Sequence, residues 1–228
     1  MRVEEASVIG DLLQGLAAEA ISPLVNIGSS TKRFRTAEQP HIEQRIFGPL
    51  LARGVKVFHA DVKADEGVDL VGDVLQPAFC ARIRQLQPKA ILCSNVLEHV
   101  VDVDAFAAAL EGLAPPGAFL LVSAPCSYPY HLDPIDNGFR PDPKALVATF
   151  RRCTPLTARL VQSVTYLDEL KRQSAADVAR LVFKSAVRVW LPFYKPDYYK
   201  NLLHRWLWLW RRYSVTVALL EKSGQPAH

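Results

Sequence analysis

The sequence lacks the marks of several protein classes. No apolar run approaches the ~20 residues that a membrane-spanning helix requires. Residues 1–5 contain no basic segment followed by an apolar core, so we expect no signal peptide. We find no internal repeat, low-complexity tract or linker in the chain. These absences predict one globular domain that is cytoplasmic, either soluble or peripheral at the inner face of the membrane.

Cysteine pairs, strong charge and dinucleotide motifs are also scarce. The four cysteines, Cys80, Cys93, Cys126 and Cys153, form no Cys-x-x-Cys pair, which indicates free thiols in a reducing cytoplasm. A formal net charge of +4 is too mild to indicate a nucleic-acid partner, and we predict none. The Gly-x-Gly-x-x-Gly pattern is missing, which disfavours a nicotinamide dehydrogenase.

What the sequence does contain is an alternation of short apolar runs with helical patterns. The spacing predicts strands over residues 24–28, 55–61, 68–74, around 91 and 120, 159–167 and 214–220. It predicts helices over residues 6–20, 41–53, 77–86, 103–113 and 141–152, with a basic loop over 31–40. This alternation predicts an α/β fold: a Rossmann-like, seven-stranded, mostly parallel sheet with helices on both faces. Residues 168–212 form a helical, aromatic-rich insert before the last strand of this single domain, 1–228.

Polar residues follow the first strands, at the points where a parallel sheet opens its ligand crevice. They are Asn26, Gly28, Ser29 and Ser30 after the first strand, Asp61 at the end of the second, and Asp73 with Val74 after the third. Glycine allows a ligand to approach the backbone closely, and a carboxylate such as Asp61 suits the two hydroxyls of a ribose. This order predicts a nucleotide-type cofactor, although each aspartate taken alone is typical of a turn or a helix cap.

A further polar crossover follows the buried run at residues 91–93. The sequence of this crossover is Ser94-Asn95-Val96-Leu97-Glu98-His99. It follows the fourth predicted strand as Gly28, Asp61 and Asp73 follow the first three. Over about residues 20–150 the chain resembles the class I S-adenosylmethionine-dependent methyltransferases, in a type 11-like group with a Gly-Ser-Ser first loop. The resemblance implies S-adenosylmethionine as cofactor, with Gly28 near its methionine part, Asp61 at the ribose, Asp73 at the adenine and Asn95 beneath the methionine end. Two alternatives stay open: His99 is structural or orders the pocket, and Glu98 faces solvent or the site.

The first loop departs from the family's usual acid followed by several glycines. Asn26 cannot hold an ammonium group through charge, and Gly28 is the only glycine of the loop. We expect Ser29 and Ser30 to supply replacement hydrogen bonds. The shortage of glycine leaves an alternative function open, a non-catalytic methyltransferase-like protein that acts as an interaction module.

The loop after the fifth predicted strand carries the candidate acceptor-binding residues Tyr128, Tyr130, His131, Asp133, Asp136, Asn137 and Arg140. For a hydroxyl acceptor, His131 is the first candidate base, with Asp133 or Asp136 to orient it. The same side chains are typical of a loop that is tied to its neighbours by hydrogen bonds. His131, Asp133, Asp136 and His99 are also metal-ligand types, but their spacing matches no recognised pattern, so we predict no metal.

The sequence indicates only the chemical class of the acceptor and the kind of partner. The loop resembles those of bacterial surface-glycan pathways, which implies methylation at oxygen of a small or glycan-type acceptor in polysaccharide biosynthesis. Residues 190–212 combine tryptophans with flanking arginines. That composition fits peripheral contact with a membrane, and it fits packing over the sheet, stacking on a sugar or a homodimer contact equally well.

Overall fold

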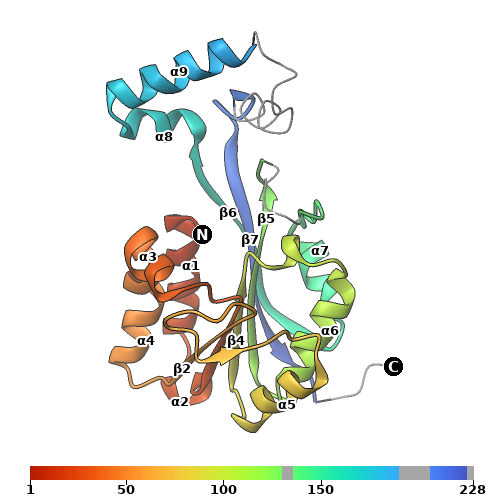
Figure 1. The fold of residues 1–228 in the computed structure, drawn as a ribbon. Coiled ribbons are helices and arrows are strands. Elements are labelled where there is room, and N and C mark those ends of the chain that lie inside the picture. The colour runs from red at the N-terminus through yellow and green to blue at the C-terminus, as the bar shows by residue number, and fades with distance from the viewer. Residues whose placement is uncertain (130–135, 190–205, 225–228) are drawn as a thin grey trace.

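The computed structural model describes residues 1–129, 136–189 and 206–224. Within these residues seven strands form one sheet in the order β3-β2-β1-β4-β5-β7-β6 (Figure 1). The strands are β1 (Leu24–Ile27), β2 (Val57–Asp61), β3 (Leu70–Val71), β4 (Ala90–Ser94), β5 (Phe119–Ser127), β6 (Cys153–Thr165) and β7 (Arg212–Lys222). Strands β1 to β5 pair in parallel, and β7 runs antiparallel between β5 and β6. The predicted mostly parallel, seven-stranded sheet is confirmed.

Helices cover both faces of the sheet (Figure 1). One face carries α1 (Val3–Gln14), α3 (Pro40–Ile42), the π-helix η2 (Glu43–Phe47) and α4 (Gly48–Ala52). The opposite face carries α5 (Pro77–Gln85), α6 (Val103–Leu113) and α7 (Pro143–Thr149). Three short helices join these elements: α2 (Ala18–Ile21), the π-helix η1 (Phe34–Glu38) and the 3-10 helix η3 (Leu97–His99).

Alternate strand residues supply two separate cores. Val25 and Ile91 are buried against α5 and α6, whereas their neighbours Leu24 and Leu92 are buried against α1 and η2. Successive side chains of a strand point to opposite faces, so a sheet that is covered on both sides needs apolar residues at nearly every position. The continuous apolar runs in the sequence therefore reflect burial of both faces.

The long strands β6 and β7 extend beyond the parallel part of the sheet and carry a helical arm (Figure 1). The arm consists of α8 (Tyr166–Arg172), α9 (Ala175–Val189) and the turn at residues 206–211. It has its own small core, made of Tyr166, Leu170, Trp208 and Tyr213. The predicted helical insert before the last strand is present, and α8 starts directly where β6 ends.

Several predicted boundaries are wrong, for local physical reasons. The predicted helix 6–20 is two helices, since α1 ends before Gly15, and glycine is a poor helix former. Residues 31–40 are not a plain loop, because Thr31 caps Phe34 through a 3.1 Å hydrogen bond and a π-helix follows. The sixth strand begins at Cys153 rather than 159, because β6 is an edge strand and tolerates Pro155.

Candidate active site

A cleft lies at the topological switch point of the sheet. Strand β1 lies between β2 and β4, and open α/β sheets bind ligands outside the carboxyl ends of two strands placed in this way. The cleft has a volume of about 520 Å³. It is lined by residues at and after the ends of β1, β4 and β5, by the chain from Met1 to the first turn of α1, and by η1, α3 and η2. Five of the predicted cofactor residues line it: Asn26, Gly28, Ser29, Ser30 and Asn95.

Gly28 brings the first loop against the turn that follows β4. Its φ angle is +69°, and a Cβ atom there would lie 2.3 Å from Cγ2 of Val96. A side chain at this position would therefore be strained and would collide with Val96. On the facing turn Asn95 has a φ of +54°, a conformation that asparagine adopts more readily than most residues. One glycine is thus enough to bring the two loops together.

The remainder of the first loop is held by Arg35, which is 3% exposed. Its guanidinium donates to the carbonyl oxygens of Ser29 at 2.9 Å, Ser30 at 2.7 Å and Gly67 at 2.7 Å. Burial lowers the pKa of Arg35 from its usual value. Sequence reasoning missed this role, because Arg35 stands beside two other cations in what reads as a solvated basic loop. The side chain of Arg35 therefore fixes a conformation of the first loop that additional glycines would otherwise permit.

Asp61, at the end of β2, also contacts the first loop. One carboxylate oxygen accepts from the amide N–H of Ser30 at 2.8 Å, and the other accepts from that of Lys63 at 3.0 Å. Each carboxylate oxygen has two lone pairs, so both retain capacity for a further donor. Asp61 therefore positions the first loop and the turn at Lys63.

Asp73 lies beside Asp61 at the same edge of the sheet. The carbonyl oxygen of Asp61 accepts from the N–H of Gly72 at 3.0 Å, which fixes the residue before Asp73. The Asp73 carboxylate accepts from the N–H of Leu75 at 2.9 Å, and Val74 is buried in the core under α5. Among the residues that the structure describes, the lining of the cleft does not include Asp61, Asp73 or Val74. Their roles toward a cofactor stay predictions.

Asn26 faces the cleft beside a neutral histidine. Nδ2 of Asn26 lies 3.1 Å from Nδ1 of His59. Burial, and next the charge of Arg35, lowers the pKa of His59 to about 4. The imidazole is therefore neutral at pH 7, and its Nδ1 accepts the hydrogen bond from Asn26. The start of the first loop thus carries no charge of its own.

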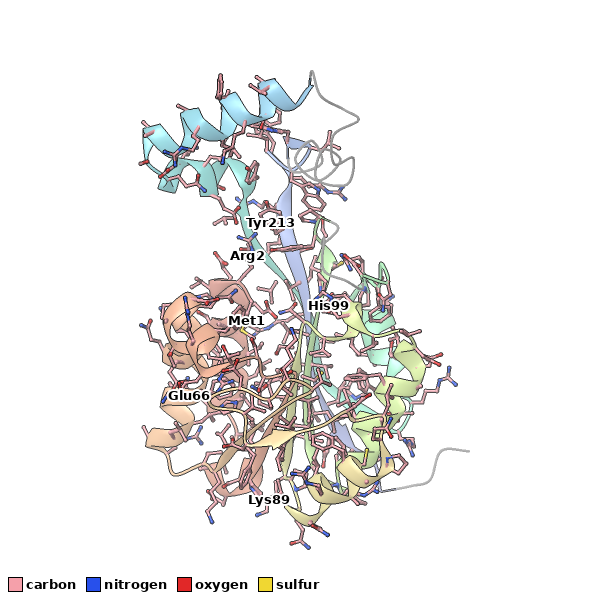
Figure 2. All side chains as sticks on the ribbon, in the orientation of Figure 1. Met1, Arg2, Glu66, Lys89, His99 and Tyr213 are labelled. Atoms are coloured by element: carbon pink, nitrogen blue, oxygen red, sulfur yellow. The ribbon has the colours of Figure 1, made fainter. Side chains whose placement is uncertain are left out.

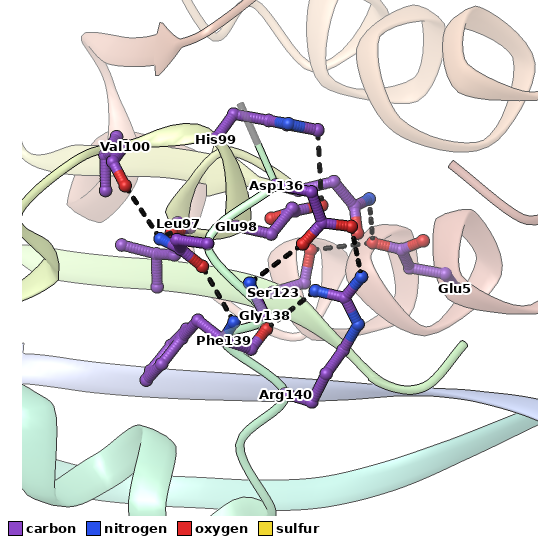
Figure 3. A network of polar contacts seen from close by, with 12 residues as sticks. Glu5, Leu97, Glu98, His99, Val100, Ser123, Asp136, Gly138, Phe139 and Arg140 are labelled. Atoms are coloured by element: carbon purple, nitrogen blue, oxygen red, sulfur yellow. Dashed lines mark hydrogen bonds and ion pairs between the residues drawn. The ribbon is translucent and has the colours of Figure 1, made fainter. Parts of the chain in front are cut away.

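A buried carboxylate from α1 forms part of the floor of the cleft (Figure 3). Glu5 is 1% exposed, and its Oε1 accepts from Nδ2 of Asn95 at 2.8 Å and from Oγ of Ser123 at 2.7 Å. Sequence reasoning missed Glu5 because the predicted first helix began at residue 6, whereas α1 begins at Val3. The signal was present, since Glu5 continues the helical face of Ile9 and Leu13 by one further turn, and both of these are buried.

Two buried oxygens at the cleft have no hydrogen-bond partner among the residues that the structure describes. They are Oγ of Ser94 and Oε2 of Glu98, and both residues line the cleft. Burial raises the pKa of the Glu98 carboxyl to about 7, and Glu5 adds to the rise. Nε2 of His99 lies 3.8 Å from Oε1 of Glu98. The sequence left the direction of Glu98 open, and the structure places its side chain in the site with 2% of its surface exposed.

The comparisons with known proteins bear on the fold. No family model and no curated protein matches the sequence. A SAM-dependent methyltransferase from Archaeoglobus fulgidus aligns at 9% identity with a TM-score of 0.52, over 95% of this chain and 94% of that chain. A candidate methyltransferase from Bacillus halodurans aligns at 11% identity with a TM-score of 0.54, over 94% of this chain and 98% of that chain.

A third solved structure, coclaurine N-methyltransferase bound to N-methylheliamine and S-adenosylhomocysteine, aligns at 11% identity with a TM-score of 0.52. That alignment covers 93% of this chain and 70% of the other. This chain has the class I methyltransferase fold. At such low identity the likeness extends to the fold alone.

In this methyltransferase fold the loop after β5 is tied to η3 (Figure 3). Nδ2 of Asn137 donates to the carbonyl oxygens of Leu97 at 2.8 Å and Val100 at 2.7 Å. The N–H of Asn137 donates to the carbonyl oxygen of Glu98 at 2.9 Å. Asn137 was predicted to contact an acceptor, and these bonds show that it fixes the turn that carries Glu98 and His99.

Asp136 and Arg140 form an ion pair within the same loop, at 2.6 Å between Oδ2 and Nη2. The Asp136 side chain is fully buried, and its other oxygen accepts from the N–H of Gly138 at 2.9 Å. Three predicted site residues, Tyr130, His131 and Asp133, lie outside the described residues. The proposed orientation of His131 by Asp136 therefore stays a prediction.

Tyr128 connects the cleft of the methyltransferase fold to the helical arm. Its hydroxyl oxygen accepts from Nη2 of Arg2 at 3.1 Å, and its ring lies 5.0 Å from that of Tyr213, centroid to centroid. The guanidinium of Arg2 lies over the Tyr213 ring at 4.2 Å and forms an ion pair with Glu169 of α8 (Figure 2). These contacts join the rim of the cleft to α8 and β7.

Within residues 1–129, 136–189 and 206–224, no group of three or more His, Cys, Asp or Glu side chains is placed to hold a metal ion. In the same ranges no helix has the length and apolar character that crossing a membrane requires. Of the segment 190–212 that was predicted to contact a membrane or a second copy, the structure describes residues 206–212.

Proposed function

We propose that this protein is an S-adenosylmethionine-dependent methyltransferase whose cofactor binds in the cleft at the carboxyl ends of β1 and β4. The observation that carries the proposal is the meeting of the Gly28 loop with the Asn95 turn at the switch point of a methyltransferase fold. A cleft of about 520 Å³ has the size of small-molecule sites. The unpartnered oxygens of Ser94 and Glu98 support it, since a polar ligand would satisfy them.

The proposed cofactor residues follow one another along the edge of the sheet. In this arrangement Gly28 approaches the methionine part, Asp61 accepts from the ribose hydroxyls and Asp73 from the adenine amino group. The full set is Asn26, Gly28, Ser29, Ser30, Asp61, Asp73, Val74 and Asn95. When bound, S-adenosylmethionine supplies an electrophilic methyl carbon. The chain itself must align the acceptor and take up the proton that the acceptor loses.

Glu98 is the described side chain best suited to take up that proton. Glu98 lines the cleft and has one oxygen, Oε2, that is buried without a hydrogen-bond partner among the described residues. A pKa of about 7 keeps a substantial fraction of the carboxyl groups ionised near neutral pH. His99 stands 3.8 Å from the other oxygen, where it stabilises the ionised form when protonated. His131, with Asp133 or Asp136, stays the second candidate for this role.

The pH dependence of turnover tests Glu98 as the base. The rate should rise with pH to a plateau above about pH 7, because the base must be ionised to accept a proton. Glu98→Gln should lower kcat by about 100-fold or more and remove the rise, with binding of S-adenosylhomocysteine retained. His131→Ala should keep most of the turnover. If Glu98→Gln keeps the wild-type rate and pH profile, Glu98 is not the base.

The proposed acceptor is a small or glycan-type molecule that is methylated at a hydroxyl, within polysaccharide biosynthesis. The sequence of the loop after β5 supports this class, and Tyr128 at the end of that strand lines the cleft. Conversion of S-adenosylmethionine to S-adenosylhomocysteine, measured with glycosides and with amines of similar size, tests it. Turnover with amines alone would contradict methylation at oxygen.

In this proposal residues 1–228 act as one methyltransferase-like domain in the cytoplasm. The contacts of Arg2 with Tyr128, Tyr213 and Glu169 support a single unit, since they join α1 to the sheet and to the arm. Limited proteolysis tests this. Joint protection of α1 and the arm is expected, and release of a stable fragment that lacks the arm would contradict it.

One observation favours a second function, that of a non-catalytic interaction module. Both oxygens of Asp61 already accept from main-chain N–H groups, and the first loop has a single glycine. Calorimetry with S-adenosylhomocysteine separates the two functions. Binding supports the methyltransferase, and no heat at millimolar ligand supports the module.

A further inference from the structure

Helix α9 has two apolar faces, and the described residues cover one of them. Val178, Leu181 and the buried Ser185 face the small core of the arm. Val182 is 48% exposed and Phe183 is 69% exposed, and Val187, one turn farther along, is 42% exposed. Phe183 and Val187 lie along one side of the helix, and Val182 lies between them and the side that packs on the core of the arm. A stripe of large apolar groups therefore faces outward from the arm.

A second exposed apolar group belongs to the same arm. In the turn at residues 206–211, Leu207 is 76% exposed and Trp210 is 79% exposed. Nε1 of Trp206 donates to Oγ of Ser185 at 3.1 Å, which fixes this turn to α9. The stripe on α9 and the turn are thus parts of one structure. Figure 1 shows that the arm stands at the far end of β6 and β7, away from the helices that cover the sheet.

Cations border the exposed apolar groups. Arg180 and Lys184 are exposed on α9, one turn apart, and Arg211 and Arg212 are exposed where the turn enters β7. The single acid of α9 is Asp177, whose carboxylate accepts from the hydroxyl of Ser174 in front of the helix. Apolar and tryptophan side chains beside cations are typical of helices that lie in the interface of an anionic membrane.

We propose that the stripe Val182, Phe183 and Val187, together with Leu207 and Trp210, docks the protein on an anionic lipid surface. The charge on the arm favours a bilayer over a second copy of this chain. A symmetric dimer would bring two copies of the same cation-bordered surface together, which adds positive charge at the interface, whereas anionic headgroups attract Arg180 and Lys184. The inference does not depend on the proposed methyl transfer, since it uses residues of the arm only.

Co-sedimentation of the full chain with vesicles tests the proposal. The protein should sediment with vesicles of phosphatidylglycerol and phosphatidylcholine at low salt, less at high salt, and poorly with pure phosphatidylcholine. Phe183→Glu should weaken binding to the anionic vesicles by about tenfold or more, because it removes a large apolar group and adds repulsion. The double variant Arg180→Gln and Lys184→Gln should lose the preference for phosphatidylglycerol.

Leu51→Glu is the matched control, because Leu51 is 54% exposed on α4 in the body of the protein. It makes the same change of charge away from the arm and should bind vesicles as the wild type does. Circular dichroism shows whether each variant is folded, and Phe183→Ser is a milder substitute if Phe183→Glu is not. The proposal is overturned if folded wild-type protein ignores anionic vesicles at low salt. It is also overturned if Phe183→Glu binds them normally, or if it merely converts a dimer into a monomer in sedimentation velocity.

Discussion

Replacing Glu98 by glutamine should stabilise the protein, and by an amount that depends on pH. Burial raises the pKa of this carboxyl from 4.5 to about 7 in the folded state. The folded protein then holds a proton that the unfolded chain releases, so stability falls as pH rises from about 4.5 to about 7 and is level above that. The difference between the two pKa values corresponds to about 3 kcal/mol in the free energy of unfolding. Glutamine cannot ionise, so the Glu98→Gln variant does not lose this stability as pH rises.

Urea denaturation at a series of pH values measures the effect. The free energy of unfolding of Glu98→Gln minus that of the wild type should increase by about 3 kcal/mol between about pH 4.5 and pH 8. Subtracting the two free energies removes the contributions of the other titrating groups, which the two proteins share. Glu19→Gln, the same substitution at an exposed glutamate, is the control. A flat difference for Glu98→Gln would refute the inference that burial raises the pKa of this carboxyl.

Three further substitutions test the loops around the cleft. Gly28→Ala should destabilise the protein by about 1–3 kcal/mol and weaken S-adenosylhomocysteine binding at least tenfold, since the new Cβ would lie 2.3 Å from Val96. Unchanged binding would argue against a role of this loop in binding the cofactor. Arg35→Lys should cost about 1–3 kcal/mol in urea denaturation, because an ammonium does not reproduce the fork that reaches Ser29, Ser30 and Gly67. Asn137→Ala should lower the free energy of unfolding by about 1–3 kcal/mol and lower kcat, because the turn that carries Glu98 loses two hydrogen bonds to its main chain. A change in KM alone would instead indicate direct contact with the acceptor.

The order of the elements was predictable from the sequence because it depends on periodicity. The apolar runs at the strands and the helical pattern over Val103–Leu113 follow directly from burial on both faces of the sheet. The residues after β1 and β4 were predictable for the same reason, since parallel strands bring their carboxyl ends to one edge. Asn26, Gly28 and Asn95 meet at the cleft as that geometry requires.

The rest depends on contacts between distant parts of the chain. Glu5 reaches Asn95 across 90 positions of sequence, and no local pattern indicates such a pairing. Arg35 reads as a solvated cation until the loops that offer it carbonyl groups are placed around it. The direction of Glu98 stayed open in the sequence, and its burial depends on where the loop after β5 ties η3. The exposed face of α9 depends in the same way on which side of the helix packs on the core of the arm.

Calorimetric titration of S-adenosylhomocysteine into the full chain tests the central claim most directly. The account predicts one site per chain with a Kd in about the micromolar range. It also predicts binding that Gly28→Ala weakens and that the surface control Leu51→Glu leaves unchanged. A folded wild-type protein that gives no heat of binding at millimolar ligand would contradict the account.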